Sequence, residues 1–153
     1  MPLKPENKIQ FHYITKPFSF TNRIRLKYFL IDLFKKERKD VSHINFIFSN
    51  DDYLLQINQH YLKHNTYTDI ITFELSDKGD PLIADIYISI ERVKENAVTF
   101  ETPFYKELLR VIFHGALHLC GYKDKTVNEK ELMIEKENYY LNLFAFSRET
   151  AAR

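Results

Sequence analysis

The sequence has few of the features that mark secreted, membrane-spanning or multidomain proteins. It contains one cysteine, Cys120, so no disulfide can form within the chain and a reducing compartment is expected. No stretch approaches the roughly 18 consecutive apolar residues of a membrane-spanning helix. Residues 1–8 lack the apolar core of a signal peptide, and the three glycines and five prolines form no linker. We therefore expect one cytoplasmic domain over residues 1–153, with residues 1–8 and 147–153 poorly ordered.

The chain also lacks a strong charge of either sign and contains no tryptophan. The 22 Lys and Arg residues nearly balance 21 Asp and Glu residues, for a net charge of +1. Any nucleic-acid-binding surface must therefore come from a local basic patch. Hydrophobic residues make up 44 % and aromatic residues 15 % of the chain. A chain of this size buries about two-thirds of its unfolded surface, so this composition predicts an ordered core and excludes wholesale disorder.

The order of the expected elements predicts an α+β fold. Apolar alternation and flanking turn residues predict four strands, at residues 9–14, 43–48, 69–75 and 82–90. Helical patterns lie between the first three strands and after the fourth. This order favours a single domain in which a small mixed four-stranded sheet is packed by about five helices.

Capping residues predict where the first two helices begin. Thr21 or Asn22 is expected to cap the first helix. Ser49 and Asp52 resemble a capping box that opens the second helix. A short third helix is expected over residues 91–100.

The last two helices have clearer signals at their ends. Thr102 is a suitable N-cap, Pro103 suits the first helical position, and Gly121 stands where a left-handed residue ends a helix. Thr126 and Glu129 form a capping-box pattern that starts the last helix. The sequence therefore predicts a long helix from Pro103 to just before Gly121.

Three residues around the end of this long helix form a candidate metal site. His114 and His118 are four apart, so they lie on one face of the helix, where two imidazoles can bind one ion. Gly121 allows the chain to reverse, so that Asp124 can return toward them. Two His and one carboxylate are a donor set of catalytic zinc, which keeps a fourth position for water. The alternative is a His pair that packs or faces solvent, but the glycine and the carboxylate favour a metal site at the end of a central helix.

The spacing is also similar to the metalloprotease motif His-Glu-x-x-His-x-x-Gly-x-x-His, with Asp in the last place. In that motif the Glu is the general base, and Gly115 stands in its position here. A zinc peptidase is therefore a weak alternative.

Residues 114–124, His-Gly-Ala-Leu-His-Leu-Cys-Gly-Tyr-Lys-Asp, resemble the HGxLHLxGYDH signature of the YbeY family of rRNA maturation factors. Met133 follows nine residues later, as it does in the family. Three further elements match in order: residues 58–61 resemble LNxxY, residues 68–73 resemble TDVLSF, and residues 84–89 resemble GDIxIS. The resemblance implies a metal-dependent, single-strand-specific endoribonuclease. It would act on the 3′ end of 16S rRNA and in ribosome quality control, with the small ribosomal subunit as partner.

The resemblance also implies the ligands and cofactor: one zinc ion, or another divalent metal, held by His114, His118 and Asp124. Two positions depart from the family pattern. Asp124 replaces the usual third histidine, and Leu62 replaces an Arg that is thought to handle phosphate. The second departure keeps open an alternative function, a ribosome-assembly binding factor with a mainly structural metal. The residues expected to contact RNA phosphates are Lys63, Arg110, Lys123 and Lys125.

The other notable polar residues have no chemical role in this interpretation. Asn58, Asp69 and Asp85 are expected to make structural hydrogen bonds. Cys120 and Met133 are expected to pack in the core.

Overall fold

The computed structural model of the chain describes residues 4–18, 22–62 and 68–151. Four strands form one sheet in the order β1-β2-β4-β3. The strands β1 and β4 each pair with β2 in parallel, and β3 pairs with β4 in antiparallel orientation. The sheet is therefore mixed and four-stranded, as predicted. Its strands are β1 Ile9–Tyr13, β2 Val41–Ser49, β3 Ile70–Glu74 and β4 Leu82–Ser89.

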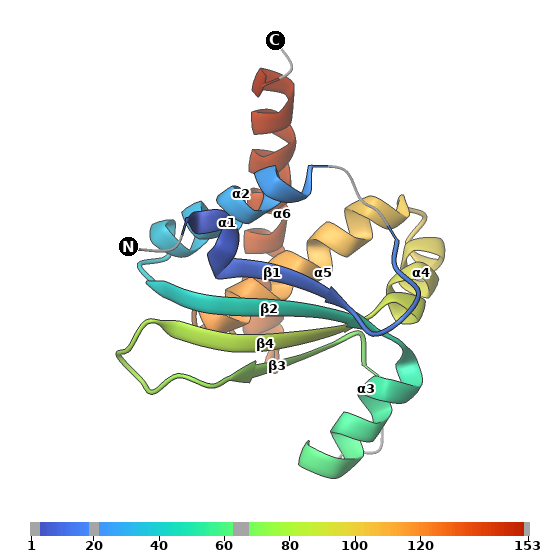
Figure 1. Ribbon diagram of the computed structural model, residues 1–153. Helices are drawn as coiled ribbons and strands as arrows, with labels where there is room; N and C mark the ends of the chain where they lie inside the picture. Colours follow the sequence, from blue (N-terminus) through green and yellow to red (C-terminus); the bar gives the residue numbers. More distant parts are fainter. Residues whose placement is uncertain (1–3, 19–21, 63–67, 152–153) are drawn as a thin grey trace.

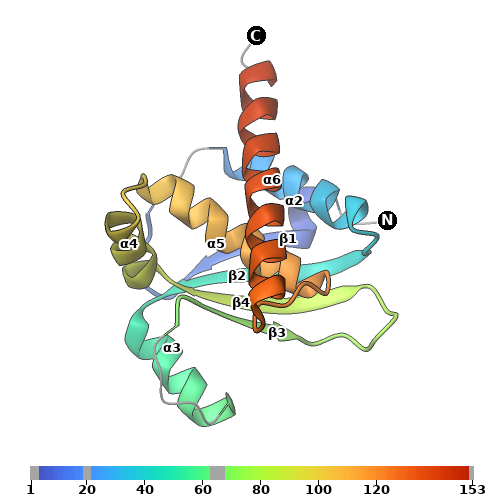
Figure 2. The same cartoon turned by 180° about the vertical axis from the view of Figure 1, so that it is seen from behind.

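Helices cover the two faces of the sheet unequally. Figure 1 shows α2, α5 and α6 on one side of the sheet and α3 on the other. Seen from behind, α6 crosses α5 and then extends away from the sheet (Figure 2). The helices are α1 Pro5–Lys8, α2 Arg23–Lys36, α3 Asp51–Ile57, α4 Ile90–Thr99, α5 Phe104–Leu119 and α6 Val127–Ala151, and α3 continues into a π-helical turn, η1 Asn58–Leu62. Helices α2 to α6 confirm the predicted fold class and the number of about five helices.

The first two predicted helix caps agree with the structure only in part. Asn22, one of the two predicted residues, is the N-cap of α2, but it has a left-handed conformation, with φ of 62°, and its side chain makes no capping hydrogen bond. Thr21, the other candidate, lies outside the described residues. Asn50 rather than Ser49 caps α3, because its side chain accepts a hydrogen bond of 2.8 Å from the Tyr53 amide. Ser49 is still part of β2, and its hydroxyl donates to the Ile88 carbonyl at 3.4 Å.

The start of α5 is also one residue later than predicted. Pro103 is the N-cap, with extended backbone angles, and the helix begins at Phe104. The Thr102 amide instead donates to the Ala97 carbonyl at 2.9 Å and so closes the end of α4. The second capping box is confirmed, because the Glu129 amide donates to the Thr126 hydroxyl at 3.1 Å and the Glu129 carboxylate accepts from the Thr126 amide at 2.8 Å.

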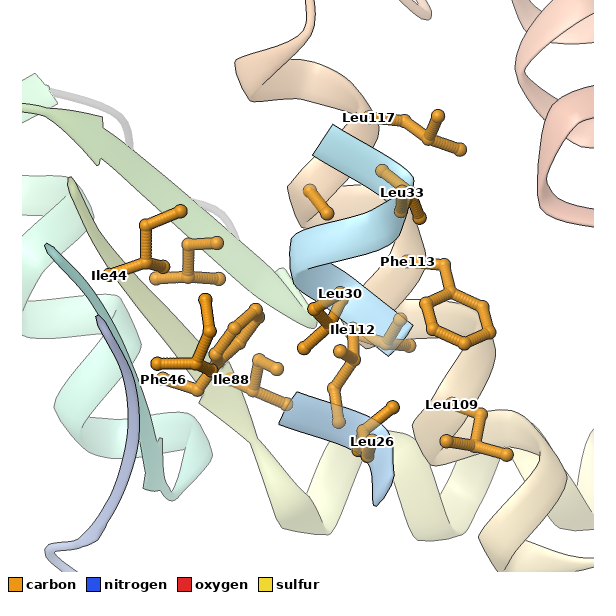
Figure 3. Close-up of a cluster of buried hydrophobic side chains, with 14 of the residues drawn as sticks. Leu26, Leu30, Leu33, Ile44, Phe46, Ile88, Leu109, Ile112, Phe113 and Leu117 are labelled. Atoms are coloured by element: carbon orange, nitrogen blue, oxygen red, sulfur yellow. The ribbon is translucent and has the colours of Figure 1, made fainter. Parts of the chain in front are cut away.

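The main core lies between the sheet and the helices α2 and α5. Figure 3 shows side chains from the sheet and these two helices packed against one another, namely Leu26, Leu30 and Leu33 of α2, Leu109, Ile112, Phe113 and Leu117 of α5, and Ile44, Phe46 and Ile88 of the sheet. Burying a side chain of this size contributes about 1.5–3 kcal/mol. This layer therefore fixes the position of α5, which carries both histidines, relative to the sheet.

A glycine allows α5 to approach the sheet closely beside His114. A Cβ atom built on Gly115 would lie 2.8 Å from Ile70 Cδ1 and 3.1 Å from Ile86 Cγ2. A side chain at this position would therefore point at β3 and β4. The glutamate of the metalloprotease motif has no room at Gly115 unless Ile70, Ile86 or α5 shifts, which weakens the peptidase alternative further.

The two residues expected to pack in the core do so. Met133 is 1 % exposed, and Cys120 is partly buried against the main core. Burial raises the pKa of the Cys120 thiol to about 12, so this thiol is not ionised near neutral pH. Across the part of the chain that the structure describes, no helix has both the length and the apolar character needed to cross a membrane.

Candidate metal centre

Helix α5 presents His114 and His118 side by side. Their ring centroids are 4.5 Å apart, and the rings are nearly perpendicular. The two side chains are 21 % and 27 % exposed. Both line a cavity of about 710 Å³, which also receives side chains from η1 and β3. The predicted pair is thus half-buried at the wall of a cavity, where a bound ion would still be accessible to a substrate.

The turn after α5 returns the chain toward this pair. Gly121 has a φ of 103°, which glycine adopts without steric strain. The Tyr122 amide donates to the Leu117 carbonyl at 3.1 Å, and the Gly121 amide donates to the His118 carbonyl at 3.0 Å. This bond pair is the Schellman arrangement that ends many helices. It confirms the predicted left-handed glycine and directs the following residues back along α5.

As a result, Asp124 meets both histidines. Its Oδ2 atom lies 3.2 Å from His114 Nε2 and 3.4 Å from His118 Nε2. Donor atoms of the three side chains all lie within 4.8 Å of one another. Ligands 2.0–2.2 Å from a tetrahedral zinc ion are separated by about 3.3–3.6 Å. The cluster therefore fits a metal ion in donor type, and its two His–Asp distances match the spacing of zinc ligands.

The other nitrogen of each ring has a hydrogen-bond acceptor. His118 Nδ1 lies 2.9 Å from the backbone carbonyl oxygen of Tyr122. His114 Nδ1 lies 2.5 Å from Oε2 of Glu137. A proton on each Nδ1 satisfies these contacts and leaves both Nε2 lone pairs directed at Asp124. Outer partners of this kind are usual behind metal-binding histidines.

Glu137 was not singled out from the sequence. It is 5 % exposed on α6, and its Oε1 atom accepts a hydrogen bond of 2.9 Å from Arg110. The signal that could have found it is helical periodicity, because Met133, Glu137 and Tyr140 all fall on the buried stripe of α6. A carboxylate on such a stripe must have partners, and its partners here are Arg110 and His114.

Negative charge surrounds His114. Burial has the largest influence on the pKa of His114 and by itself lowers it, but the hydrogen bond and charge of Glu137, together with Asp69 and Asp124, outweigh burial and raise the pKa. Burial also raises the pKa of Asp69, although His114 opposes this. Three carboxylates therefore raise the pKa of one imidazole, and such a negative environment favours a bound cation.

The predicted phosphate-binding residues are not all gathered at this cavity. Lys125 lines it together with Leu62, whereas Lys123 lines a different hollow beside Glu37. Arg110 donates to Glu137 and, at 2.7 Å, to Oδ1 of Asn138. Lys63 lies outside the described residues. The RNA-binding role of these four residues stays a prediction.

The three polar residues expected to have structural roles lie in two different places. Asn58 is 4 % exposed and lines the cavity, as does Asp69. Asp85 instead accepts a hydrogen bond of 3.1 Å from the Asn45 side chain, between neighbouring strands. Asp85 therefore has the structural bond that was expected, although its partner is a side chain rather than a loop backbone.

Comparison with known proteins identifies the family of the chain. Residues 14–145 match the model of the family described as endoribonuclease YbeY. The endoribonuclease YbeY of Flavobacterium psychrophilum is 56 % identical over 108 residues, which cover 71 % of this chain and 76 % of that protein. The endoribonuclease YbeY of Cytophaga hutchinsonii is 43 % identical over 141 residues, covering 92 % and 99 %.

A solved structure shares the fold. The solution structure of TM1509 from Thermotoga maritima superposes with a TM-score of 0.63 and 30 % sequence identity, covering 94 % of this chain and 93 % of that one. The match to the family model extends over most of the chain, and the identity to both relatives is well above 30 %. The chain therefore belongs to the endoribonuclease YbeY family.

Proposed function

We propose that the chain is a zinc-dependent, single-strand-specific endoribonuclease of the cytoplasm, which acts on the 3′ end of 16S rRNA during ribosome maturation and in ribosome quality control. Membership of the endoribonuclease YbeY family supports an enzyme that hydrolyses RNA internally. The observation that carries the proposal is the convergence of His114 Nε2, His118 Nε2 and Asp124 Oδ2 at the wall of a cavity.

His114, His118 and Asp124 would hold the ion. When bound, zinc supplies Lewis acidity toward a phosphoryl oxygen and activates water near neutral pH. Asp124 in place of a third histidine adds a negative charge and a harder donor, so the site should also accept other divalent ions. The hydrogen bonds at both Nδ1 atoms keep the two rings oriented for this role.

Lys125 is the residue we assign to the RNA phosphates at this site. Among the described residues that line the cavity, it alone carries a permanent positive charge, since the family Arg is replaced by Leu62. Lys63 and Lys123, which are close in sequence to Leu62 and Lys125, would extend the contact along the RNA strand. We assign Arg110 a smaller part, because its guanidinium already bonds to Glu137 and Asn138.

We also assign Asp69, which lines the same cavity, to proton exchange with the reacting oxygens. Burial raises the pKa of its carboxyl, and a carboxyl positioned at the reacting atoms can exchange a proton with them. The attacking group is either water or the neighbouring 2′-hydroxyl of the RNA. Products that end in a 2′,3′-cyclic phosphate would identify the 2′-hydroxyl.

The test is a paired measurement on purified protein. Bound metal is measured by elemental analysis, and cleavage is compared between single-stranded and duplex RNA, for the unmodified chain, Asp124→Ala and the exposed control Asp32→Ala. We expect one zinc ion per chain and cleavage of the single strand alone, both lost in Asp124→Ala and both kept in Asp32→Ala. Unchanged metal content and activity in Asp124→Ala would remove Asp124 from the site.

Leu62 at the cavity wall also favours a second candidate, a ribosome-assembly factor whose metal is mainly structural. A binding factor of this kind should keep ribosome association and cellular function after His114→Ala, provided that the variant folds. Loss of both, together with loss of RNA cleavage, supports the nuclease.

A further inference from the structure

A buried carboxylate on α6 bridges the candidate metal centre and an arginine on α5. Glu137 is 5 % exposed, and each of its two oxygens has one partner. Oε2 lies 2.5 Å from His114 Nδ1, and Oε1 accepts from Arg110 at 2.9 Å. Arg110 is one turn before His114 on α5, so the three side chains form one connected row between the two helices.

Stability alone gives a weak reason for this row. An ion pair taken out of water loses solvation that its mutual attraction often only just offsets, and well-packed apolar residues in its place are often as stable or more so. Tyr140 and Phe144, the next residues on the buried stripe of α6, show that this interface accommodates large aromatic side chains. The carboxylate at Glu137 therefore calls for a role that an apolar side chain would not fill.

Glu137 is in the wrong place to be a metal ligand itself. It contacts Nδ1 of His114, whereas Asp124 faces the opposite ring nitrogen, Nε2, at 3.2 Å. A carboxylate that accepts from Nδ1–H fixes the proton on that nitrogen and keeps Nε2 available. It also stops the ring from turning about its bond to Cβ.

We propose that Glu137 is a positioning residue, which holds His114 with a proton on Nδ1 and with Nε2 facing His118 and Asp124, and that Arg110 holds Glu137 in turn. The two Nη atoms of Arg110 form a fork, in which one donates to Glu137 and the other to Asn138 of α6. This fork fixes the direction of the Glu137 carboxylate. The inference rests on the proposed metal site, but the orientation of His114 that it describes is also present in the metal-free protein.

The first measurement uses the metal-free protein. Correlation of the imidazole nitrogens and protons by NMR, at a pH where His114 is neutral, reports which ring nitrogen carries the proton. We expect Nδ1–H in the unmodified chain and a loss of that preference in Glu137→Gln, whose amide keeps the shape but lacks the charge. Nδ1–H retained at the same population in Glu137→Gln would overturn the proposal. This readout is independent of RNA cleavage, so it can fail while the nuclease function holds, and it can succeed if that function fails.

The second measurement is zinc affinity, by competition with a chelator of known affinity. Loss of an outer partner of a metal ligand typically weakens binding roughly 10–100-fold, and we expect this range for Glu137→Gln. Arg110→Lys, which keeps the charge but loses the fork, should weaken binding less. Glu135→Gln, an exposed change two residues away on the same helix, should have no effect. Equal zinc affinities for Glu137→Gln and Glu135→Gln would contradict the proposal.

A purely structural role for Glu137 makes a different prediction. In that case Glu137→Gln would lower the midpoint of thermal unfolding of the metal-free protein without changing the tautomer of His114. If Glu137→Gln does not fold, Glu137→Asp serves instead, because its shorter side chain keeps the charge but withdraws the carboxylate from Nδ1. Loss of the Nδ1–H preference in Glu137→Asp supports the positioning role, and its retention overturns it.

Discussion

His114 and His118 are one helical turn apart and face the same carboxylate, yet they are held by different means. His118 is supported locally, because its acceptor is the backbone carbonyl of Tyr122, four residues further along the chain. His114 is supported from a distance, by the Glu137 side chain 23 residues away on α6. The first support is made by the end of α5 itself, and the second exists only where α6 crosses α5 (Figure 2).

This difference indicates how each histidine should respond to change. The His118 support depends on the backbone of the turn, so side-chain substitutions in the turn should leave it intact unless they alter the backbone angles. The His114 support depends on one side chain and on the packing between two helices. Changes at Gly121 should therefore affect the His118 side, and changes at Glu137 or Gly115 the His114 side.

The largest effect is expected from removing either ring. His114→Ala and His118→Ala each delete one of three donor atoms, so both should lose more zinc affinity than the roughly 10–100-fold typical of an outer partner. The two variants should lose zinc affinity equally, because the two rings would be equivalent as ligands however they are supported. Zinc titration against a chelator measures this, with His12→Ala as a control, since His12 lies on β1 and bonds to Asn45. Stoichiometric tight binding by either variant would contradict a three-ligand site.

The next effect concerns the turn below His118. Gly121→Ala places a Cβ on a residue with φ of 103°, and a non-glycine residue with a left-handed backbone costs about 1–2 kcal/mol. The free energy of unfolding, from denaturant titration, should fall by this amount. Gly79→Ala is a matched control, because Gly79 has φ of 94° and equally open space around it. Both variants should lose stability, but only Gly121→Ala should also lose zinc affinity; equal affinities would show that the turn does not position His118.

A smaller effect is expected beside His114. In Gly115→Ala the new Cβ would lie 2.8 Å from Ile70 Cδ1. Overpacking costs roughly 1–3 kcal/mol, whereas alanine gains up to about 1 kcal/mol in helix propensity over glycine, so a net loss of about 1 kcal/mol is expected. Ile70→Val removes the methyl group in contact, and the double variant should recover part of the loss in a thermal unfolding experiment. A stabilised Gly115→Ala variant would show that the Ile70 side chain or α5 moves aside without cost.

The smallest effect at neutral pH concerns a partly buried carboxylate, Glu37. Burial by itself raises its pKa, but hydrogen bonds from the Tyr140 and Tyr122 hydroxyls and the charge of Lys136 outweigh burial and lower the pKa below its usual 4.5. Because the folded-state pKa is the lower one, the ionised carboxylate contributes stability above pH 4.5, and this contribution is lost as the pH falls through the folded-state value. Glu37 thus supports the His118 side through Tyr122, whose carbonyl holds the ring.

Glu37→Gln removes this titration. Its free energy of unfolding should therefore fall less steeply between pH 5 and pH 3 than that of the unmodified chain, as measured by denaturant unfolding at several pH values within roughly this window. Asp32→Gln on the exposed face of α2 serves as the control and should leave the slope unchanged. An unchanged slope for Glu37→Gln would mean that Glu37 has the same pKa in the folded and unfolded chains.

The sequence predicted most of the fold and missed its details at element ends. All four strands and five helices follow from periodicity, because apolar spacing is a local property. The caps of α3 and α5 were wrong by one residue. Whether Ser49 or Asn50 caps α3 depends on which of the two side chains is bonded to the neighbouring strand. The Ser49 hydroxyl donates to the Ile88 carbonyl of β4, which leaves Asn50 to cap α3. The roles of His114, His118 and Asp124 as ligands, and of Lys63, Arg110, Lys123 and Lys125 as RNA contacts, stay predictions.

What the sequence by itself determined is the meeting of His114, His118 and Asp124. Their spacing on one helix and the reversal at Gly121 involve eleven consecutive residues, and short-range backbone geometry suffices to bring them together. What only the tertiary structure decided is the environment of His114: Glu137 at its Nδ1, Arg110 behind Glu137, and Asp69 nearby in the cavity. Glu137 comes from α6 and Asp69 from the segment before β3, and Arg110, on α5 itself, reaches Glu137 only across the interface between the two helices. Their meeting depends on how α6 crosses α5 and how α5 lies on the sheet, and no local pattern encodes those two relations.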